Sequence, residues 1–370
     1  MPRSYQTRKP ARDPDPCAAC GARLKSAGRK VGSRREQRLP GGGELAQLYG
    51  QDDVTGSLKG RQVAVLGFGN QGEAQALNLR DRGFDVVVGN RDDEYADRAR
   101  SQGLSVLDIA SAGAGGAVVV VLLPDEVQPH YENVFRSLGE GQTLVFASGY
   151  NLAFDRLAVS PHADVILAAP RMLGAGVRDL VQRGRGFPML VAAHQDVSGQ
   201  AMPTALAYCE AVGAFLPGGV AVASSFREEA ILDLFSEHTW AASLTFFLEA
   251  CFEVLTRSGI SEEAALLELY ASGELGTVGA AIAERGLFAQ MALHSTTSQY
   301  GQLTRGPGYI TDAMRERLAS VVQALSDGSF AREWGAAEDT GRLEELRRAV
   351  SNTPVARAED RLYRILGRRS

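Results

Sequence analysis

Cysteine is scarce in this sequence, and the scarcity limits the chemistry that the chain supports. Only four of the 370 residues are cysteines, too few for a disulfide framework in a protein of this size. Cys17 and Cys20 have the spacing of half a zinc site, but no second Cys or His pair follows nearby in the sequence to complete four ligands. Cys209 and Cys251 fall within apolar segments with helical spacing. We therefore expect core cysteines and no metal knuckle.

Long hydrophobic runs are also absent. No apolar run approaches the ~18 residues of a membrane-spanning helix, and no apolar signal-peptide core opens the chain. The hydrophobic content of 45% and the charged content of 22% are ordinary for a globular protein. We expect a cytoplasmic protein without membrane contact, with room for two domains in 370 residues.

Acidic residues are few at the start of the chain. Residues 1–39 hold 11 Lys/Arg and 3 Asp/Glu, whereas the whole chain holds 39 Lys/Arg and 44 Asp/Glu. This basic segment is rich in Pro, Gly and Ser and lacks periodic apolar residues, which predicts a disordered tail over residues 1–43. A basic tail can hold nucleic acid or an acidic partner, but a solvated extension is commoner, and we expect no nucleic-acid binding.

What the chain does have is an apolar run that ends at a glycine-rich turn. Residues 63–66 suit a strand buried on both faces, and Gly67, Gly69 and Gly72 follow with the spacing G-x-G-x-x-G. The first glycine permits a tight turn, the second lets a pyrophosphate approach, and the third lets the next helix pack on the strand. We therefore predict a dinucleotide site that includes Gly67, Phe68, Gly69, Asn70, Gln71 and Gly72. The alternative is a purely structural turn.

Acidic residues after the second predicted strand bear on the choice of nucleotide. Asp92, Asp93 and Glu94 are consecutive, and carboxylates repel the 2′-phosphate of NADPH but accept hydrogen bonds from the free 2′-OH of NADH. Arg91 is the counter-argument, although its guanidinium can also stack on adenine. The acids also suit a solvated helix N-terminus. We predict that Arg91, Asp92 and Glu94 contact the cofactor and that NADH is preferred over NADPH.

Strand and helix patterns alternate up to about residue 222, and helical periods then continue almost without interruption. The alternation predicts a parallel sheet covered on both faces. We expect a Rossmann domain over residues 44–222 and an all-helical domain over residues 223–370.

Read together, these segments resemble the short form of the ketol-acid reductoisomerase family. The resemblance extends from about residue 45 to residue 368, and the matching stretches are residues 63–80, 122–126, 226–229, 233–237, 299–301 and 328–334. The family's fold is a Rossmann domain followed by a knotted helical domain that pairs with a second subunit. The resemblance therefore implies a homodimer or a higher homo-oligomer, a small-molecule substrate, a nicotinamide cofactor beside Leu123, Pro124, Asp125 and Gly149, and Mg²⁺.

The metal ligands implied by the resemblance are only half preserved. Asp233 and Glu237 are four residues apart in a helical segment, so both carboxylates lie on one face and suit Mg²⁺. The second family pair is one helical turn apart, whereas Glu268 and Glu274 are six apart, which places them some 120° apart around a helix. Only a break near Gly273 brings them together. One Mg²⁺ ion fits this pattern better than two.

Two catalytic positions depart from the family pattern. Ser148 stands where the family has histidine, and Arg171 stands where it has lysine. Neither side chain exchanges a proton near neutral pH as the family residue does. Ser295 matches the family's substrate-binding serine, which comes from the partner subunit. We predict an NADH-preferring reductase of a 2-keto acid or a related C=O or C=N substrate, without the family's alkyl migration. A working reductoisomerase and a non-catalytic nucleotide-binding partner are the alternatives.

Overall fold

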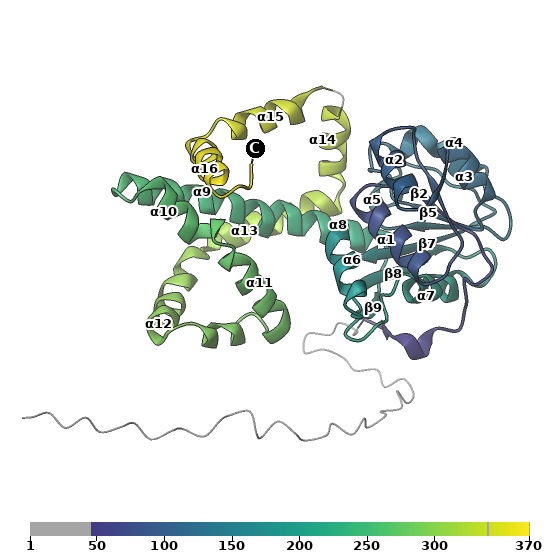
Figure 1. Ribbon diagram of the computed structural model, residues 1–370, viewed down its shortest axis with the longest axis horizontal. Coiled ribbons are helices and arrows are strands. Elements are labelled where there is room, and N and C mark those ends of the chain that lie inside the picture. The colour runs from purple at the N-terminus through teal and green to yellow at the C-terminus, as the bar shows by residue number, and fades with distance from the viewer. Residues whose placement is uncertain (1–45, 339, 370) are drawn as a thin grey trace, which may run out of the picture. The chain divides into compact units, whose positions relative to one another are not determined.

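The computed structural model describes residues 46–338 and 340–369 of the chain. The basic segment 1–43 and its Cys17 and Cys20 lie outside the described residues, as do the expectations stated for them. In the described part a sheet-containing region comes first, and only helices follow after the last strand ends at Ala223 (Figure 1). This confirms the Rossmann-like domain followed by a helical region, whereas the knot remains a prediction.

The sheet has nine strands in the order β1-β9-β8-β7-β6-β5-β2-β3-β4. Its central strands are apolar and fully buried because helices cover both faces. The carboxyl ends of β2, β3, β5, β6 and β7 meet at one edge, since these strands are parallel. The strands are β1 Leu48–Tyr49, β2 Val63–Leu66, β3 Val86–Gly89, β4 Ser105–Leu107, β5 Val118–Val121, β6 Thr143–Phe146, β7 Asp164–Pro170, β8 Pro188–Gln195 and β9 Val220–Ala223.

The expectation of an all-parallel sheet is wrong at two places. Strand β8 runs antiparallel to β7, and the short β1 runs antiparallel to β9. The chain leaves β7 at Pro170, forms helix α6 (Gly174–Gln182), and starts β8 beside the end of β7, where Met189 pairs with Pro170. Helix α6 packs against α1 (Asn70–Asp81) and does not carry the chain back to the start of β7. The direction of β8 therefore depends on a helix–helix contact that the alternation pattern does not encode.

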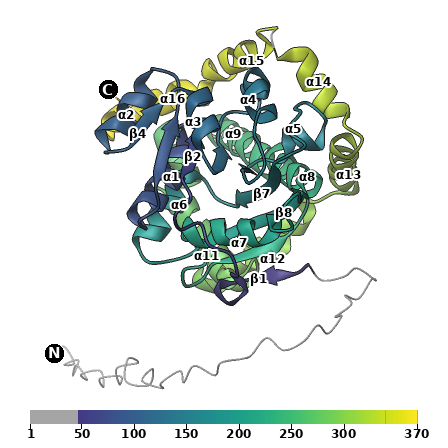
Figure 2. The same ribbon diagram turned by 90° about the vertical axis from the view of Figure 1, so that its right-hand side faces the viewer.

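Two apolar cores lie on opposite faces of the sheet. One contains α1, α6 and α7 (Ala201–Ala211), and the other contains α3 (Ile109–Gly115) and α4 (Glu132–Arg136). Figure 2 shows α3, α4 and α5 (Tyr150–Ala153) on one side of the strands and α6 and α7 on the other. Helix α2 (Glu94–Ser101) follows β3. Because both faces are packed, the polar groups at the carboxyl edge of the strands remain available for a ligand.

The helical region begins with a long, nearly continuous helix. Helix α8 (Phe226–Ser236) passes through a π-helical turn (Glu237–Ala241) into α9 (Ala242–Arg257), and a second π-helical turn (Leu267–Ala271) follows α10 (Glu262–Leu266). π-helical turns often accompany functional sites, and the first of these begins at a predicted metal ligand. The remaining helices are α11 Glu274–Arg285, α12 Thr296–Arg305, α13 Asp312–Ser326, α14 Ser329–Ala337, α15 Arg342–Ser351 and α16 Pro354–Ile365.

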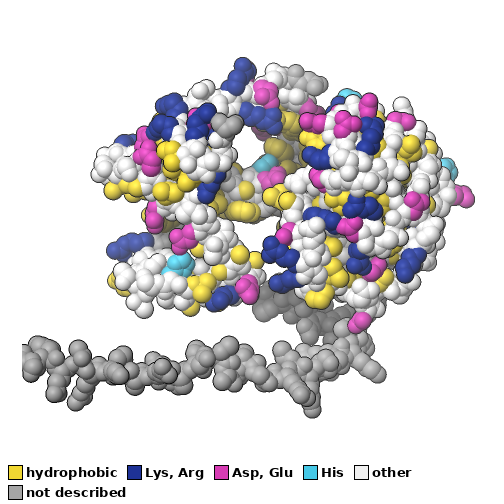
Figure 3. Space-filling model, in the orientation of Figure 1, with side chains coloured by type: hydrophobic (Ala, Val, Ile, Leu, Met, Phe, Trp, Pro, Cys, Tyr) yellow, Lys and Arg dark blue, Asp and Glu magenta, His cyan; other side chains and the backbone are white. Residues whose placement is uncertain are grey.

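Large apolar side chains are exposed over the helical region (Figure 3). Trp240, Phe246, Phe288 and Tyr300 are each more than half exposed in this single chain. Exposed apolar surface of this extent is typical of an interaction face. Within residues 46–338 and 340–369, no helix has the length and hydrophobicity needed to span a membrane.

Candidate active site

The glycine-rich turn between β2 and α1 has the geometry of a phosphate-binding turn. Gly67 has φ +95°, and a Cβ added there would lie 2.7 Å from the Leu122 carbonyl oxygen. A Cβ added at Gly72 would lie 2.1 Å from the Gly67 carbonyl oxygen, whereas one added at Gly69 meets nothing within 4 Å. Gly67 and Gly72 are therefore required by the fold, while Gly69 leaves open space at the N-terminus of α1, where a pyrophosphate binds favourably.

A cavity of about 620 Å³ begins at this turn and follows the carboxyl edge of the sheet. Most of the residues predicted to bind the cofactor line it, together with the predicted catalytic serine. They are Gly67, Phe68, Gly69, Asn70, Gln71, Arg91, Leu123, Pro124, Asp125 and Ser148. The Phe68 ring itself is buried in the core beneath the turn. The cavity lies at the carboxyl edge of the sheet, where a Rossmann fold binds a nicotinamide dinucleotide.

The three acidic residues at positions 92–94 differ in their relation to the cavity. Asp92 is highly exposed, pairs with Arg100 at 2.9 Å and does not line the cavity, and Glu94 does not line it either. Asp93 lines it and caps α2 by accepting from the Tyr95 N–H at 3.0 Å. The Asn90 amide also holds the Asp93 carboxylate, at 2.8 Å. Asp93 is therefore the one acidic side chain of positions 92–94 that lines the cavity, and Asn90 and the N-terminus of α2 hold it in place.

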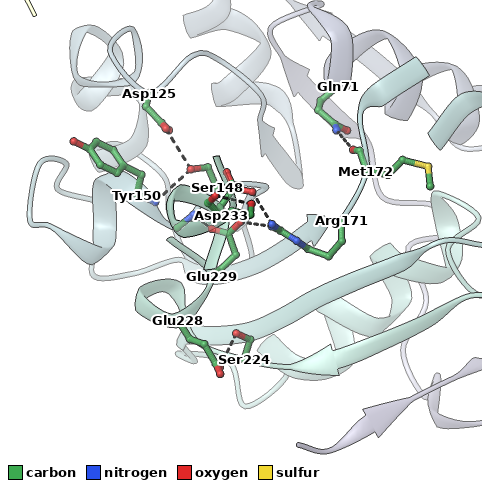
Figure 4. Close-up of polar contacts among 12 residues, drawn as sticks. Gln71, Asp125, Ser148, Tyr150, Arg171, Met172, Ser224, Glu228, Glu229 and Asp233 are labelled. Atoms are coloured by element: carbon green, nitrogen blue, oxygen red, sulfur yellow. Dashed lines mark hydrogen bonds and ion pairs between the residues drawn. The ribbon is translucent and has the colours of Figure 1, made fainter. Parts of the chain in front are cut away.

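Arg171 lies at the centre of a second group of polar residues, at the junction of the sheet and α8 (Figure 4). Its guanidinium donates to Glu229 Oε1 at 2.7 Å and to Asp233 Oδ1 at 2.6 Å. Glu229 is one turn before Asp233 on α8, so both carboxylates face the end of β7. Arg171 and Asp233 are predicted site residues, whereas Glu229 was not predicted, although it stands in a stretch that resembles the family.

Glu229 is the most deeply buried carboxylate of this group, with only 2% of its surface exposed. Its Oε2 accepts from the Gly149 N–H at 2.6 Å. Burial raises the pKa of Glu229 to about 7, opposed by the Gly149 N–H and by the charge of Arg171. Burial also raises the pKa of Glu237, and the nearby charge of Asp233 raises it further. Glu229, Asp233 and Glu237 thus all interact with the single guanidinium of Arg171.

Asp125 and Ser148 connect this group to the dinucleotide cavity. The Ser148 hydroxyl donates to Asp125 Oδ2 at 3.4 Å, and the Gln128 amide donates to Asp125 Oδ1 at 3.2 Å. Asn151 in turn holds Gln128 and the Asp125 carbonyl oxygen. Burial raises the pKa of Asp125 to about 6, while the hydrogen bond from Ser148 lowers it. Each oxygen of the Asp125 carboxylate therefore accepts a hydrogen bond from a different side chain.

The predicted metal ligands do not form a metal site in the described chain. Asp233 Oδ1 is bonded to Arg171, so a divalent cation on that oxygen would face the guanidinium at close range. Gly273, with φ +87°, does break the helix between the exposed Glu268 and Glu274. Even so, no group of three or more His, Cys, Asp or Glu side chains among the described residues is arranged to hold a metal ion. The prediction of Mg²⁺ on Asp233 and Glu237 is therefore not tested by a single chain.

The last predicted residue, Ser295, lies apart from these groups. It is exposed and caps helix α12, accepting from the Ser298 N–H at 3.2 Å. Neither Arg171 nor Asp125 bonds to it. Its predicted role in a partner's site is therefore not tested by a single chain.

Comparisons with known proteins agree with this architecture. Residues 57–218 match the family model "Acetohydroxy acid isomeroreductase, NADPH-binding domain", and residues 226–367 match "Ketol-acid reductoisomerase, C-terminal domain". A protein of Saccharolobus solfataricus provisionally named ketol-acid reductoisomerase 3 is 45% identical over 84% of this chain and 96% of its own length. The ketol-acid reductoisomerase (NADP(+)) of Methanopyrus kandleri is 38% identical over 87% of this chain and 99% of its own.

A solved structure gives the same result. The NADH-preferring ketol-acid reductoisomerase from an uncultured archean superposes with a TM-score of 0.81 at 31% identity, covering 86% of this chain and 98% of that one. The two family models together span most of the chain, from the glycine-rich turn to the last helix. The protein is therefore an NAD(P)H-dependent oxidoreductase that belongs to the ketol-acid reductoisomerase family.

Proposed function

We propose that this protein is an NADH-preferring reductase of a 2-keto acid or a related C=O or C=N substrate, and that it does not catalyse the family's alkyl migration. The single observation that carries the proposal is the state of Arg171, which is bound to both Glu229 and Asp233. Alkyl migration needs an alkoxide, matched proton transfers and cations to hold the oxygens. Here the guanidinium stays charged and takes up the carboxylate that a metal would need.

Hydride transfer requires fewer groups from the protein than alkyl migration does. The nicotinamide, when bound, supplies the hydride. Pro124 and Asp125 line the cavity at the carboxyl edge of β5, and Ser148 lines it from the end of β6. These residues position a small acceptor and keep water from one side of it. No step in this proposal uses a metal ion.

The preference for NADH is supported at the other end of the cavity. Asp93 lines the wall there, and its carboxylate is fixed by Asn90 and by the N-terminus of α2. A fixed carboxylate repels a 2′-phosphate and accepts from a 2′-OH. The NADH preference named for the solved archaeal relative points in the same direction.

A homodimer in the cytoplasm is part of the proposal. The exposed apolar side chains of the helical region, among them Trp240 and Phe288, suit an interface with a second copy of the chain. A single Mg²⁺ ion on Asp233 and Glu237 is the competing arrangement, in which the ion would share the Asp233 carboxylate with Arg171, which bonds to Oδ1.

One experiment separates the candidate functions. NADH oxidation is measured with 2-acetolactate and, separately, with 3-hydroxy-3-methyl-2-oxobutyrate, its isomerised counterpart, each with Mg²⁺ and with EDTA. We expect oxidation with the isomerised keto acid and at least ~100-fold slower oxidation with acetolactate. Comparable rates in Mg²⁺ would identify a working reductoisomerase. Tight NADH binding without oxidation of any keto acid or imine would identify a non-catalytic protein.

A further inference from the structure

The guanidinium of Arg98 connects helix α2 to the glycine-rich turn. Its Nη2 donates to the Phe68 carbonyl oxygen at 3.2 Å, and this carbonyl lies between Gly67 and Gly69 in the turn. Its Nε forms an ion pair with Glu73 Oε2 at 3.1 Å, in the first turn of α1. The guanidinium also lies over the Phe68 ring, 6.0 Å from its centroid. Arg98 therefore contacts the backbone of the turn and the helix that follows it.

A second side chain of α2 contacts the same carboxylate. Gln102, the C-cap of α2, donates from its amide to Glu73 Oε1 at 2.6 Å. Each oxygen of Glu73 thus contacts a different side chain at α2. Because Arg98 and Glu73 are both partly exposed, water screens their attraction and the pair adds little stability. A planar guanidinium presents its N–H groups in fixed directions, so one side chain holds a carboxylate and a carbonyl in a defined geometry.

Arg98 also covers the ring of Tyr95, which lies three residues earlier on the same face of α2. The guanidinium carbon is 4.9 Å from the ring centroid, a distance typical of a cation–π contact. Tyr95 lines the dinucleotide cavity beside Arg91 and Asp93, and 39% of its surface is exposed. In a Rossmann fold, the residues that follow the second strand of the nucleotide-binding unit contact the adenosine ribose. Tyr95 therefore lies at the adenosine end of the cavity, with ring surface available to a ligand.

We propose that Arg98 is a positioning residue for the adenosine half of the cofactor. It holds the Tyr95 ring in place relative to the phosphate-binding turn, and the ring packs against the adenosine. A dinucleotide contacts both places at once, so its affinity depends on their being arranged before it binds. Arg98 does not line the cavity itself, and its charge is paired with Glu73, so it acts through Tyr95. The role concerns cofactor binding and is independent of the substrate that is reduced.

The test measures which half of the cofactor loses affinity when Arg98 is changed in the full chain. The probes are NADH, ADP-ribose, which lacks the nicotinamide, and reduced nicotinamide mononucleotide, which lacks the adenosine. We expect Arg98→Met to raise the Kd for NADH and for ADP-ribose by at least ~10-fold, while the Kd for the mononucleotide stays within twofold of the wild type. Equal losses for all three probes would indicate a general loosening of the fold, and would overturn the inference. Wild-type affinity for ADP-ribose would overturn it as well.

Arg100→Met is the matched control. Arg100 lies on the same helix, is exposed, and pairs with Asp92 and Asp97. We expect its Kd values for all three probes to stay within twofold of the wild type. A loss as large as that of Arg98→Met would mean that removing any cation from α2 weakens binding, which contradicts a specific role. NADPH separates positioning from direct contact, because a larger loss for NADPH than for NADH in Arg98→Met would make Arg98 a ligand of the 2′-phosphate instead.

Tyr95→Ala tests the same role without removing Arg98, and it serves if Arg98→Met does not fold. The contacts of Arg98 with Phe68 and Glu73 do not involve the Tyr95 side chain. We expect Tyr95→Ala to raise the Kd for ADP-ribose by at least ~10-fold. In the double variant, the loss of binding free energy should be smaller than the sum of the two single losses, because Arg98 acts through the ring. Additive losses, or wild-type affinity in Tyr95→Ala, would each contradict the proposal.

Discussion

The backbone N–H of Gly149 donates to Glu229 Oε2 at 2.6 Å, and this bond joins the loop after β6 to helix α8. The other oxygen of the same carboxylate accepts from Arg171, which follows β7. The buried Glu229 side chain of α8 therefore bonds to two loops of the sheet, one at Gly149 and one at Arg171. The relative placement of these loops depends on how closely Gly149 approaches α8.

The close approach at Gly149 leads to a prediction about stability. A Cβ added at Gly149 would lie 2.1 Å from the Phe226 carbonyl oxygen, a backbone atom that cannot rotate away. We expect Gly149→Ala to lower the free energy of unfolding by about 1–3 kcal/mol, measured by denaturant titration. Gly139→Ala is the matched control, because a Cβ there meets nothing within 4 Å. Equal midpoints for the two variants would show that the loop and α8 are not packed as described.

The glycine-rich turn allows cofactor binding to be separated from folding. Because a Cβ at Gly69 meets no protein atom, we expect Gly69→Ala to unfold at the wild-type temperature and to bind NADH at least ~10-fold more weakly. Gly72→Ala should instead lose stability, since its Cβ would lie 2.1 Å from the Gly67 carbonyl oxygen. Fluorescence titration with NADH and thermal unfolding measure the two effects. Unchanged NADH affinity in Gly69→Ala would place the pyrophosphate elsewhere.

Features encoded in local sequence were predictable from the chain. The buried strand β2, the turn at Gly67 and the helix α1 follow from an apolar run and glycine spacing, and the cavity lies beside them. The antiparallel direction of β8 depends on α6 packing against α1, a contact between residues about 100 positions apart. No local pattern reports such a contact.

The same distinction holds for the site residues. Residues of the glycine-rich turn could be proposed for the site from local spacing alone, and they line the cavity. The pairing of Arg171 with Glu229 and Asp233 joins positions 58 and 62 residues apart, so the sequence indicated an altered side chain but not the cluster it forms. Among the three acids at positions 92–94, only the fold shows that Asp93 faces the cavity while Asp92 faces solvent.

The contrast between Asp93 and Asp92 gives a prediction about nucleotide choice. Asp93→Ser removes the charge while keeping a hydroxyl that can cap α2. We expect the ratio of the NADPH Kd to the NADH Kd to fall by about 10-fold in this variant, because the repulsion of the 2′-phosphate is relieved. Asp92→Ser should change the ratio less than twofold, since Asp92 is highly exposed and paired with Arg100. If the effects of the two variants were reversed, the ribose would lie beside Asp92.

The burial of Glu229 leads to a prediction about stability and pH. Its pKa rises from the ordinary 4.5 to about 7 on folding, so between these values the folded chain binds more protons than the unfolded chain. The free energy of unfolding must therefore fall as pH rises through this window, and the stabilising contribution of the protonated form is lost above about pH 7. Thermal unfolding at several pH values from about pH 5 to about pH 8 measures the slope.

Glu229→Gln removes the titrating group, so we expect its melting temperature to depend less steeply on pH than that of the wild type, whatever its absolute stability. Glu228→Gln is the control, because Glu228 is the neighbouring residue and is exposed. Its carboxylate accepts from the Ser224 hydroxyl, and its backbone N–H donates to Ser225, the N-cap of α8. This variant should keep the wild-type slope. A wild-type slope in Glu229→Gln would mean that Glu229 stays ionised when folded, and that Arg171 and Gly149 outweigh the cost of burying its charge.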